Sequence, residues 1–265
     1  MSSSPEIEGF REESFAHDGI SHPVYKGGAG SCVIVIHELP GLHPGVVAFA
    51  RRVVGRGHSV WMPSLFGTPM KPFGIPYTAQ SFTNACVARE FTQFALDGPG
   101  PVMGWLRALA ADAHAAWGGR GVGAVGMCFT GGFALGMAVD DRMLAPVLSQ
   151  PSMPLPVGRR RQRSAGVSDA DLARVAERAT RGACAMGLRF SHDRMVPEAR
   201  FETLRRALGD SFIAVEIDSS PGNQWGIGRL AHSVLTLDLV DEPGHPTSAA
   251  LERVLDFLDE QLADH

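Results

Sequence analysis

Short apolar runs alternate with longer amphipathic runs along most of this 265-residue chain, and this alternation is what most constrains its fold. Several of the short runs are apolar at consecutive positions, which is typical of strands that are buried on both faces. Such strands belong in a parallel sheet covered by helices on each side. The sequence therefore predicts a single α/β domain over residues 1–265, with a mostly parallel central sheet and helices on both faces.

The same pattern places the individual elements. We expect strands at 31–38, 58–63, 121–127, 142–150, 183–191 and 212–218. We expect helices at 44–57, 79–94, 102–117, 129–139, 168–179, 197–208 and 247–262.

Charge argues against nucleic acid as a partner. The formal net charge is −4, so the chain as a whole has no electrostatic attraction to a phosphate backbone. One basic cluster, formed by Arg159, Arg160, Arg161 and Arg163, has no aromatic residues among its arginines. We interpret it as a solvated, mobile loop rather than a nucleic-acid site.

Hydropathy and cysteine usage predict a cytoplasmic protein. No run of 18 consecutive apolar residues occurs, and the first residues carry neither the basic nor the apolar part of a signal peptide. We therefore expect no contact with a membrane. Four widely separated cysteines, Cys32, Cys86, Cys128 and Cys184, form no CxxC pair, which favours reduced thiols over a metal site or a dithiol redox motif.

The stretch GMCFTGG, residues 126–132, places Cys128 between a predicted strand and a predicted helix. The glycines around it allow the sharp reversal of a nucleophile elbow, in which the apex residue adopts an unusual backbone angle and projects above the sheet. The N-terminus of the following helix favours negative charge at that apex, either a thiolate or an oxyanion. The alternative is that Cys128 is a small buried core residue.

Two other motifs predict no cofactor and no metal. Residues 121–126, GVGAVG, match the dinucleotide fingerprint, but their glycines lie before and inside the predicted strand instead of after it. In HELPGLH, residues 37–43, the Pro40-Gly41 break keeps the two histidines from sharing a helical face.

A thiol nucleophile needs a base, and the base needs a carboxylate that orients it. Asp193, in SHDRMVP, follows a predicted strand at the position where an α/β-hydrolase carries its acid, although it could instead cap the next helix. Two histidines compete for the base, His232 in RLAHSV and His245 just before the last helix. Their positions alone leave both open.

On these residues the chain resembles the dienelactone hydrolase family of α/β-hydrolases, over about residues 20–262. GMCFTGG is similar to the family's G-x-C-x-G-G elbow with one extra residue, and residues 193–197 match its D-x-x-V-P. Glu38, in VIHELPG, matches a glutamate that follows the first long strand of the family. The family histidine stands about two dozen residues before a closing helix similar to AALERVLDFL, which favours His232 over His245.

The resemblance implies hydrolysis of a small-molecule ester or lactone without a cofactor. Cys128 would attack the carbonyl, and the backbone N–H groups of Leu39 and Phe129 would bind the oxyanion. His232, oriented by Asp193, would activate the water that releases the acid. Glu38 would pair with the resting thiol and help to generate the thiolate.

The substrate is less well indicated. Family members that act on dienelactone bind its carboxylate with arginines, one of them shortly after the histidine, whereas residues 233–236 here contain none. Arg89 and Arg194 are the candidates to replace it, although surface ion pairs would also explain them. A cap-like insertion at 151–166 could reshape the pocket.

Two rival hypotheses belong to other classes. A catalytically silent hydrolase fold could bind a small ligand, and an exposed thiol at a helix N-terminus could react with peroxide. The sequence predicts no particular oligomeric state.

Overall fold

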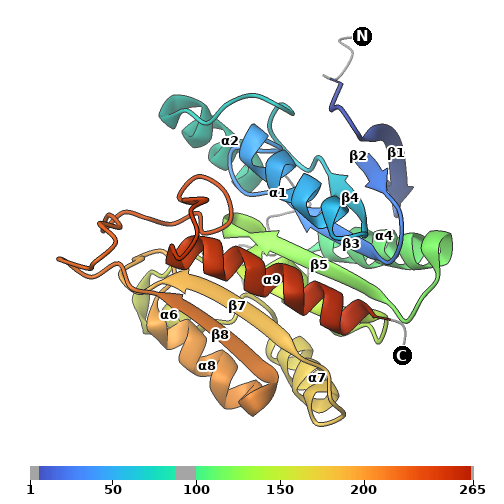
Figure 1. Ribbon diagram of the computed structural model, residues 1–265. Helices are drawn as coiled ribbons and strands as arrows, with labels where there is room; N and C mark the ends of the chain where they lie inside the picture. Colours follow the sequence, from blue (N-terminus) through green and yellow to red (C-terminus); the bar gives the residue numbers. More distant parts are fainter. Residues whose placement is uncertain (1–5, 88–99, 264–265) are drawn as a thin grey trace.

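An eight-stranded sheet forms the centre of the computed structural model, which describes residues 6–87 and 100–263 (Figure 1). Its spatial order is β1-β2-β4-β3-β5-β6-β7-β8, antiparallel at β1–β2 and β2–β4 and parallel from β4 onward. The strands are β1 (Arg11–His17), β2 (Ile20–Gly28), β3 (Cys32–Ile36), β4 (Ser59–Pro63), β5 (Val122–Met127), β6 (Met143–Ser149), β7 (Ala185–Phe190) and β8 (Phe212–Ile217).

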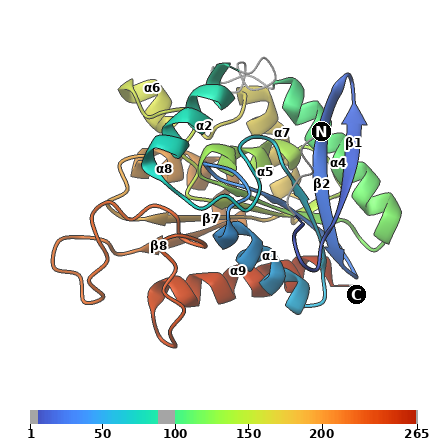
Figure 2. The same cartoon turned by 90° about the horizontal axis from the view of Figure 1, so that it is seen from above.

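Helices cover both faces of this sheet, as Figure 2 shows from above. One face carries α1 (Pro44–Gly55) and α9 (Pro246–Leu262). The opposite face carries α2 (Ile75–Val87), α4 (Pro101–Trp117), α5 (Gly131–Met137), α6 (Gly158–Arg163), α7 (Asp169–Ala179) and α8 (Glu198–Leu208). Single 3₁₀ turns lie at Cys128–Thr130 and Gly209–Ser211.

The core has two halves because successive strand residues point to opposite faces of the sheet. In β3, Cys32 and Ile34 pack with the helices around α4 and α5, whereas Val33 and Val35 pack with α1 and α9. All five β3 residues are buried. The expectation of a mostly parallel sheet with helices on both faces is confirmed.

Each of the six predicted strands is present, but the N-terminal hairpin β1–β2 was not predicted. It turns at Asp18 and Gly19, which both have positive φ (49° and 76°), as a type I′ hairpin turn requires. An Asp-Gly pair between alternating polar and apolar residues is a recognisable hairpin signal, so the sequence did contain it.

Two helix predictions need comment. The helix expected at 79–94 is α2, which begins earlier, at Ile75, and beyond Val87 the prediction lies outside the described residues. The loop predicted around Arg159–Arg163 is wrong, because these residues form the short helix α6. This segment is ordered because Arg200 of α8 donates hydrogen bonds to its main-chain carbonyls, as described below. No residue of α6 is buried.

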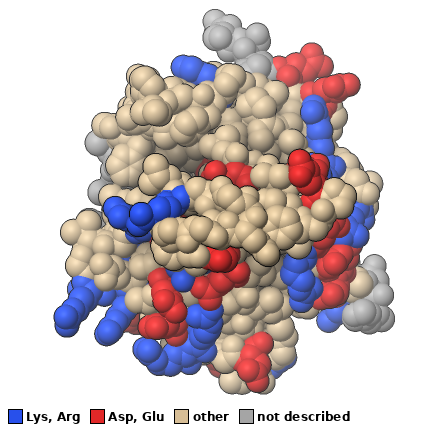
Figure 3. All heavy atoms as spheres, turned by 60° about the vertical axis from the view of Figure 1, so that its left-hand side comes forward, with Lys and Arg blue, Asp and Glu red and all other residues tan. Residues whose placement is uncertain are grey.

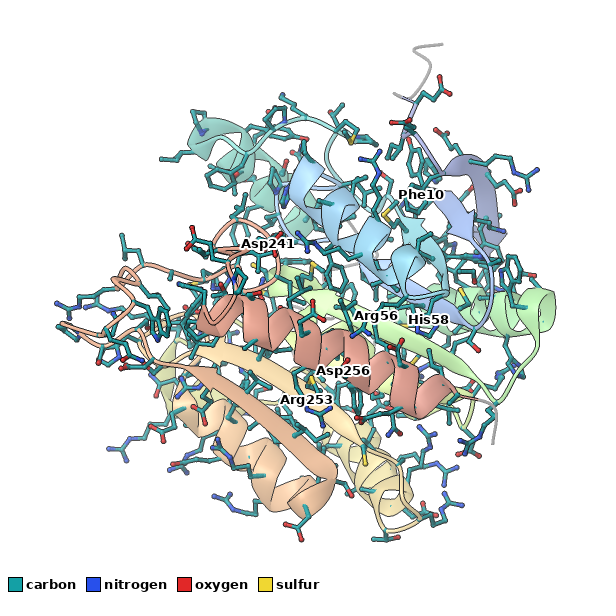
Figure 4. All side chains as sticks on the ribbon, in the orientation of Figure 1. Phe10, Arg56, His58, Asp241, Arg253 and Asp256 are labelled. Atoms are coloured by element: carbon teal, nitrogen blue, oxygen red, sulfur yellow. The ribbon has the colours of Figure 1, made fainter. Side chains whose placement is uncertain are left out.

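Helix α9 is joined to α1 and the start of β4 by charged side chains on the outer surface (Figure 4). Arg56, just after α1, pairs with Asp256 and lies 3.3 Å from Asp259. His58 contacts the same Asp259 at 2.8 Å. The exposed pairs of Arg56 each add little stability, but together with His58 they join α9 to the end of α1 and the start of β4. In the described part of the chain, no helix is long and apolar enough to cross a bilayer.

Candidate active site

Cys128 occupies the tight turn between β5 and α5. Its φ is 52°, a left-handed value that residues with a side chain seldom adopt, so the unusual backbone angle expected for an elbow is confirmed. A Cβ on Gly126 would collide with the carbonyl oxygen of Thr130, and one on Gly131 would lie 2.5 Å from Pro151 Cα. Glycine is therefore required on both sides of the turn.

Thr130 fastens this turn to the neighbouring strand. Its hydroxyl lies 2.9 Å from the carbonyl oxygen of Ile36 and 3.1 Å from that of His37, and it accepts the N–H of Met127 at 3.1 Å. Since Ile36 ends β3, the elbow and the segment after β3 are held against each other. Leu39 and Phe129, the two predicted oxyanion donors, lie in these two adjoining segments.

Four residues that follow neighbouring strands meet at one edge of the sheet. Glu38 follows β3, Cys128 follows β5, Ser152 follows β6 and Asp193 follows β7. The carboxyl ends of parallel strands are where α/β proteins place their ligands and catalytic groups. His232 joins them from the long segment between β8 and α9.

The Cys128 thiol has two side-chain partners. Its Sγ lies 3.4 Å from the hydroxyl oxygen of Ser152, and it forms a hydrogen bond with His232. The main chain strengthens the first contact, because the Ser152 N–H donates to the Cys128 carbonyl at 3.0 Å. Cys128 is 9% exposed and Ser152 2%.

Asp193 orients His232. Its Oδ2 lies 2.6 Å from His232 Nδ1, and its Oδ1 accepts the N–H of Met195 at 2.8 Å. With Nδ1 committed to the carboxylate, Nε2 is the ring nitrogen left for the thiol. The main chain is held as well, since Asp238 accepts the N–H groups of His232 and Ser233, each at 2.8 Å.

The electrostatics of this group favour a protonated imidazole. Burial by itself would lower the pKa of His232, but negative charge on Cys128 and on Asp193, both hydrogen-bonded to the ring, outweighs burial. The pKa of His232 is therefore raised well above its usual value. The arrangement favours an imidazolium ion at His232.

His245 lies elsewhere. It is the N-cap of α9, where Nδ1 accepts the N–H of Thr247, and its ring packs edge-on against Trp225. Of the two candidate histidines, the structure brings only His232 to Cys128 and Asp193 among the residues that it describes.

Glu38 is enclosed by hydrogen-bond donors. Its Oε1 accepts from His43 Nε2 at 3.1 Å and from the Thr236 hydroxyl, and its Oε2 accepts from the Ser233 hydroxyl at 2.7 Å and from Gln150 Nε2 at 3.1 Å. Burial alone would raise the pKa of Glu38, but the hydrogen bonds from His43, Thr236 and Ser233 lower it. The result is a buried carboxylate that stays ionised, and His43 contributes most to its lowered pKa.

The tautomer of His43 is settled by its two contacts. Its Nδ1 accepts the N–H of Gly45 as the N-cap of α1, so Nε2 carries the proton that is donated to Glu38. His37, the other histidine of HELPGLH, accepts the N–H of Leu65 at Nε2 and donates from Nδ1 to the Glu38 carbonyl. Burial lowers the pKa of His37 to about 4. Through these contacts both histidines hold the segment after β3 in place.

The pairing of Glu38 with the resting thiol, implied by the family resemblance, is not formed here. Within the described part of the chain, Cys128 is not among the hydrogen-bond partners of Glu38. The two oxygens already accept four hydrogen bonds, which is close to the full capacity of a carboxylate. Two of the donors, Ser233 and Thr236, come from the segment that carries His232.

The segment after β6 is held in place by a buried arginine of α8. Arg200 donates to four main-chain carbonyls of this segment: Pro151, Pro154 at 2.7 Å, Arg161 at 3.1 Å and Ser164 at 2.7 Å. Its side chain is fully buried. The predicted insertion at 151–166 is thus packed against α8, and its first residues place Ser152 beside the thiol.

Of the two arginines predicted as candidates to bind a substrate carboxylate, one lies in the described part of the chain and the other does not. Arg89 lies outside the described residues. Arg194 lines a cavity of about 270 Å³ together with His192, Arg229 and Leu230. Because His192 and Arg194 flank Asp193 in the chain, this cavity lies beside the Asp193–His232 pair.

Sequence reasoning missed several residues of this site. Ser152 and Gln150 have no local motif that marks them, and they reach the site because β3, β5 and β6 are neighbours in the sheet. His43 belongs to HELPGLH, whose spacing was tested only for a metal site, and it contacts Glu38 within the same segment. Ser233 and Thr236 could have been found, because both lie on the segment that follows the candidate base.

Comparison with known proteins decides the family. A model of the dienelactone hydrolase family matches residues 23–262. The chain belongs to the dienelactone hydrolase family. No curated protein sequence matches it. As a member of this family, the chain is an α/β-hydrolase, and its sheet order and elbow are those of a hydrolase fold.

Solved structures show the same fold at low sequence identity. A protein from Klebsiella pneumoniae assigned as a dienelactone hydrolase has 20% identity and a TM-score of 0.65, with 95% of this chain and 98% of that chain covered. A dienelactone hydrolase-like promiscuous phosphotriesterase from metagenomic libraries has 15% identity and a TM-score of 0.63, covering 96% and 98%. Dienelactone hydrolase from Anabaena variabilis has 15% identity and a TM-score of 0.59, covering 97% and 100%.

Proposed function

We propose that this hydrolase cleaves a carboxylic ester or lactone through a thiol nucleophile, Cys128. One observation carries the proposal: Cys128 sits at a strained turn and hydrogen-bonds to a histidine whose other nitrogen lies 2.6 Å from a buried carboxylate. This is the nucleophile, base and orienting acid that covalent acyl transfer requires.

In the first half of the reaction, the Cys128 thiolate attacks the carbonyl carbon. The carbonyl oxygen becomes an oxyanion, and we assign its stabilisation to the backbone N–H groups of Phe129 and Leu39. As the ring C–O or ester C–O bond breaks, His232 gives its Nε2 proton to the leaving oxygen. A thioester remains on Cys128.

In the second half, His232 is neutral and acts as a base. It takes a proton from water, the resulting hydroxide attacks the thioester carbonyl, and the C–S bond breaks. The product acid leaves and the thiolate–imidazolium pair is restored. Asp193 stabilises the positive charge on His232 in both halves, and the Ser152 hydroxyl donates to the sulfur when it is a thiolate.

We assign Glu38 a positioning role. By binding Ser233 and Thr236 it holds the segment that carries His232, and by binding Gln150 it holds the end of β6. His232 can then generate the thiolate directly, without the carboxylate moving to the sulfur. Arg194, beside Asp193, is the described candidate for binding an acidic group of the substrate.

The experiment compares the hydrolysis of p-nitrophenyl acetate and of cis-dienelactone by wild type, Cys128→Ala and Cys184→Ala. Cys128→Ala should reduce both rates by roughly a thousandfold or more. Cys184→Ala removes another thiol, far from the site in the fold, and should leave both rates unchanged. When the reaction of the wild type with the more slowly hydrolysed of these two substrates is quenched, mass spectrometry should show an acyl adduct on Cys128.

Each alternative gives a different result. An inert wild type that still binds the lactone would replace the proposal with a binding module. Hydrolysis that survives Cys128→Ala would exclude the thiol mechanism, and reversible oxidation of Cys128 by peroxide in an enzyme with no hydrolytic rate would favour a redox thiol.

A further inference from the structure

A cavity of about 440 Å³ lies between α6, α7 and α8, away from Cys128. Arginines and hydroxyl side chains dominate its polar lining, which includes Arg160, Arg163, Ser168, Asp169, Thr203 and Arg206. None of Cys128, Asp193 and His232 lines it. Figure 3 shows several Lys and Arg side chains on the lower left of one face of the molecule, with Asp and Glu side chains among them.

The three arginines of the cavity come from two helices, α6 and α8. Arg160 and Arg163 are three residues apart on α6 and so share one side of that helix, and Arg206 comes from α8. Within the described residues, none of the three forms an ion pair. By contrast, the neighbouring Arg205 pairs with Glu216, and Arg178 of α7 lies 3.1 Å from Asp141.

Charge in the cavity is therefore unbalanced. Asp169 is the single acidic residue of its lining, against three arginines. The N-terminus of α7 adds positive potential, because Ser168 is its N-cap and Asp169 its first residue. Three guanidinium groups within one small cavity repel one another unless an anion neutralises them.

The walls of the cavity are fixed before any ligand arrives. The buried guanidinium of Arg200 donates to the carbonyl of Pro154, before α6, at 2.7 Å and to that of Ser164, just after α6, at 2.7 Å, which ties both ends of the α6 segment to α8. The Ser168 hydroxyl caps the N–H of Asp171 at 3.0 Å. Fixed walls reduce the ordering cost of binding.

We propose that this cavity binds a small soluble phosphate compound with at least two negative charges. Guanidinium groups match the oxygen geometry of phosphate with paired N–H donors, and the hydroxyl of Ser168, which accepts a main-chain N–H, can donate its own proton to the same oxygens. The volume lies in the range of small-molecule sites. The lining contains no aromatic residue on which a nucleic-acid base could stack.

The test is calorimetric titration of the full-length protein with pyrophosphate at constant ionic strength, with citrate as a non-phosphate polyanion. Wild type should bind pyrophosphate saturably at one site and bind citrate at least tenfold more weakly. Arg160→Ala, Arg163→Ala and Arg206→Ala should each weaken pyrophosphate binding about tenfold or more.

The matched control is Arg159→Ala. This variant removes the same charge from the same helix, but Arg159 does not line the cavity, so its affinity should stay within about twofold of wild type. Circular dichroism and the melting temperature show whether each variant is folded. Cys128→Ala should bind pyrophosphate like wild type, which separates this site from the proposed hydrolase chemistry.

Three outcomes would overturn the proposal. The first is the absence of saturable pyrophosphate binding to the folded wild type. The second is equal weakening by Arg159→Ala, which would show a diffuse charge effect. The third is citrate binding as tight as that of pyrophosphate, which would show a general polyanion surface instead of a phosphate site.

Discussion

Two buried carboxylates, Glu38 and Asp193, lie at the same edge of the sheet and have opposite surroundings. Glu38 accepts four hydrogen bonds, which occupy both of its oxygens. Asp193 accepts one main-chain N–H and the ring of His232, a group that changes its charge. A carboxylate whose oxygens already accept their full number of hydrogen bonds can only hold the neighbouring segments in place. A carboxylate bound to an ionisable partner can stabilise a charge that forms on that partner during a reaction.

The comparison also explains the departure of Glu38 from the thiol pairing implied by the family resemblance. Bringing the Glu38 carboxylate to Cys128 would leave the buried donors of Ser233, Gln150 or Thr236 unsatisfied. Each unsatisfied buried donor costs about 1–3 kcal/mol. The thiol instead meets His232 and Ser152, which need no such rearrangement.

The largest effect should come from Asp193→Asn. We expect kcat/KM for p-nitrophenyl acetate to fall by roughly 10³ to 10⁴, because the amide neither holds the ring in the required tautomer nor stabilises its positive charge. Steady-state kinetics measures the fall. If Asp193→Asn retained more than a tenth of wild-type kcat/KM, the division of roles between the two carboxylates would be wrong.

The pH dependence of stability and of activity tests the role of Asp193 further. The raised pKa of His232 means that the imidazolium persists to higher pH in the folded protein than in the unfolded chain. Its contribution to stability is complete below the unfolded pKa of about 6.5 and is lost as pH rises through the folded pKa.

The alkaline limb of kcat/KM should follow this titration and move to lower pH in Asp193→Asn, because one of the charges that raises the pKa of His232 is gone. Urea unfolding across the same pH range should show a smaller loss of stability at high pH in the variant than in the wild type. An alkaline limb that stays in place would show that Asp193 does not control His232.

An intermediate effect is expected for Ser152→Ala. Removing the hydroxyl that donates to the thiolate should lower kcat/KM about tenfold and slow alkylation of Cys128 by iodoacetamide at neutral pH. Ser59→Ala is the matched control, since Ser59 is a buried serine that pairs in register with another buried cysteine, Cys32. Equal activities of the two variants would show that the Ser152 hydroxyl does not contribute to the reaction.

The smallest effect on activity is expected for Glu38→Gln. We expect kcat/KM to stay within about tenfold of wild type, while the free energy of unfolding falls by about 1–3 kcal/mol, because the new NH₂ group faces donors. Kinetics and urea unfolding separate the two quantities. A loss of activity as large as that of Asp193→Asn, without a loss of stability, would return Glu38 to a catalytic role.

The parts of the fold and of the candidate site differ in how far the sequence alone could predict them. Both predictions at the elbow, its position and its backbone strain, followed from glycine spacing alone. The β1–β2 hairpin was missed although Asp18-Gly19 signals it, because its strands are half-polar and lack the continuous apolar run that marked the others. The short helix α6 contains no apolar face, so no periodicity could predict it.

The sequence by itself determined the parallel sheet, its helices and the turn that carries Cys128, because apolar periodicity and glycine spacing act over short stretches of chain. The family resemblance favoured His232 over His245, but only the tertiary structure brought His232 to Cys128 and Asp193, surrounded Glu38 with donors and brought Ser152 to the thiol. These contacts join residues between 5 and 198 positions apart. They depend on which strands are neighbours and on how the loops pack, and no local pattern in the chain records either.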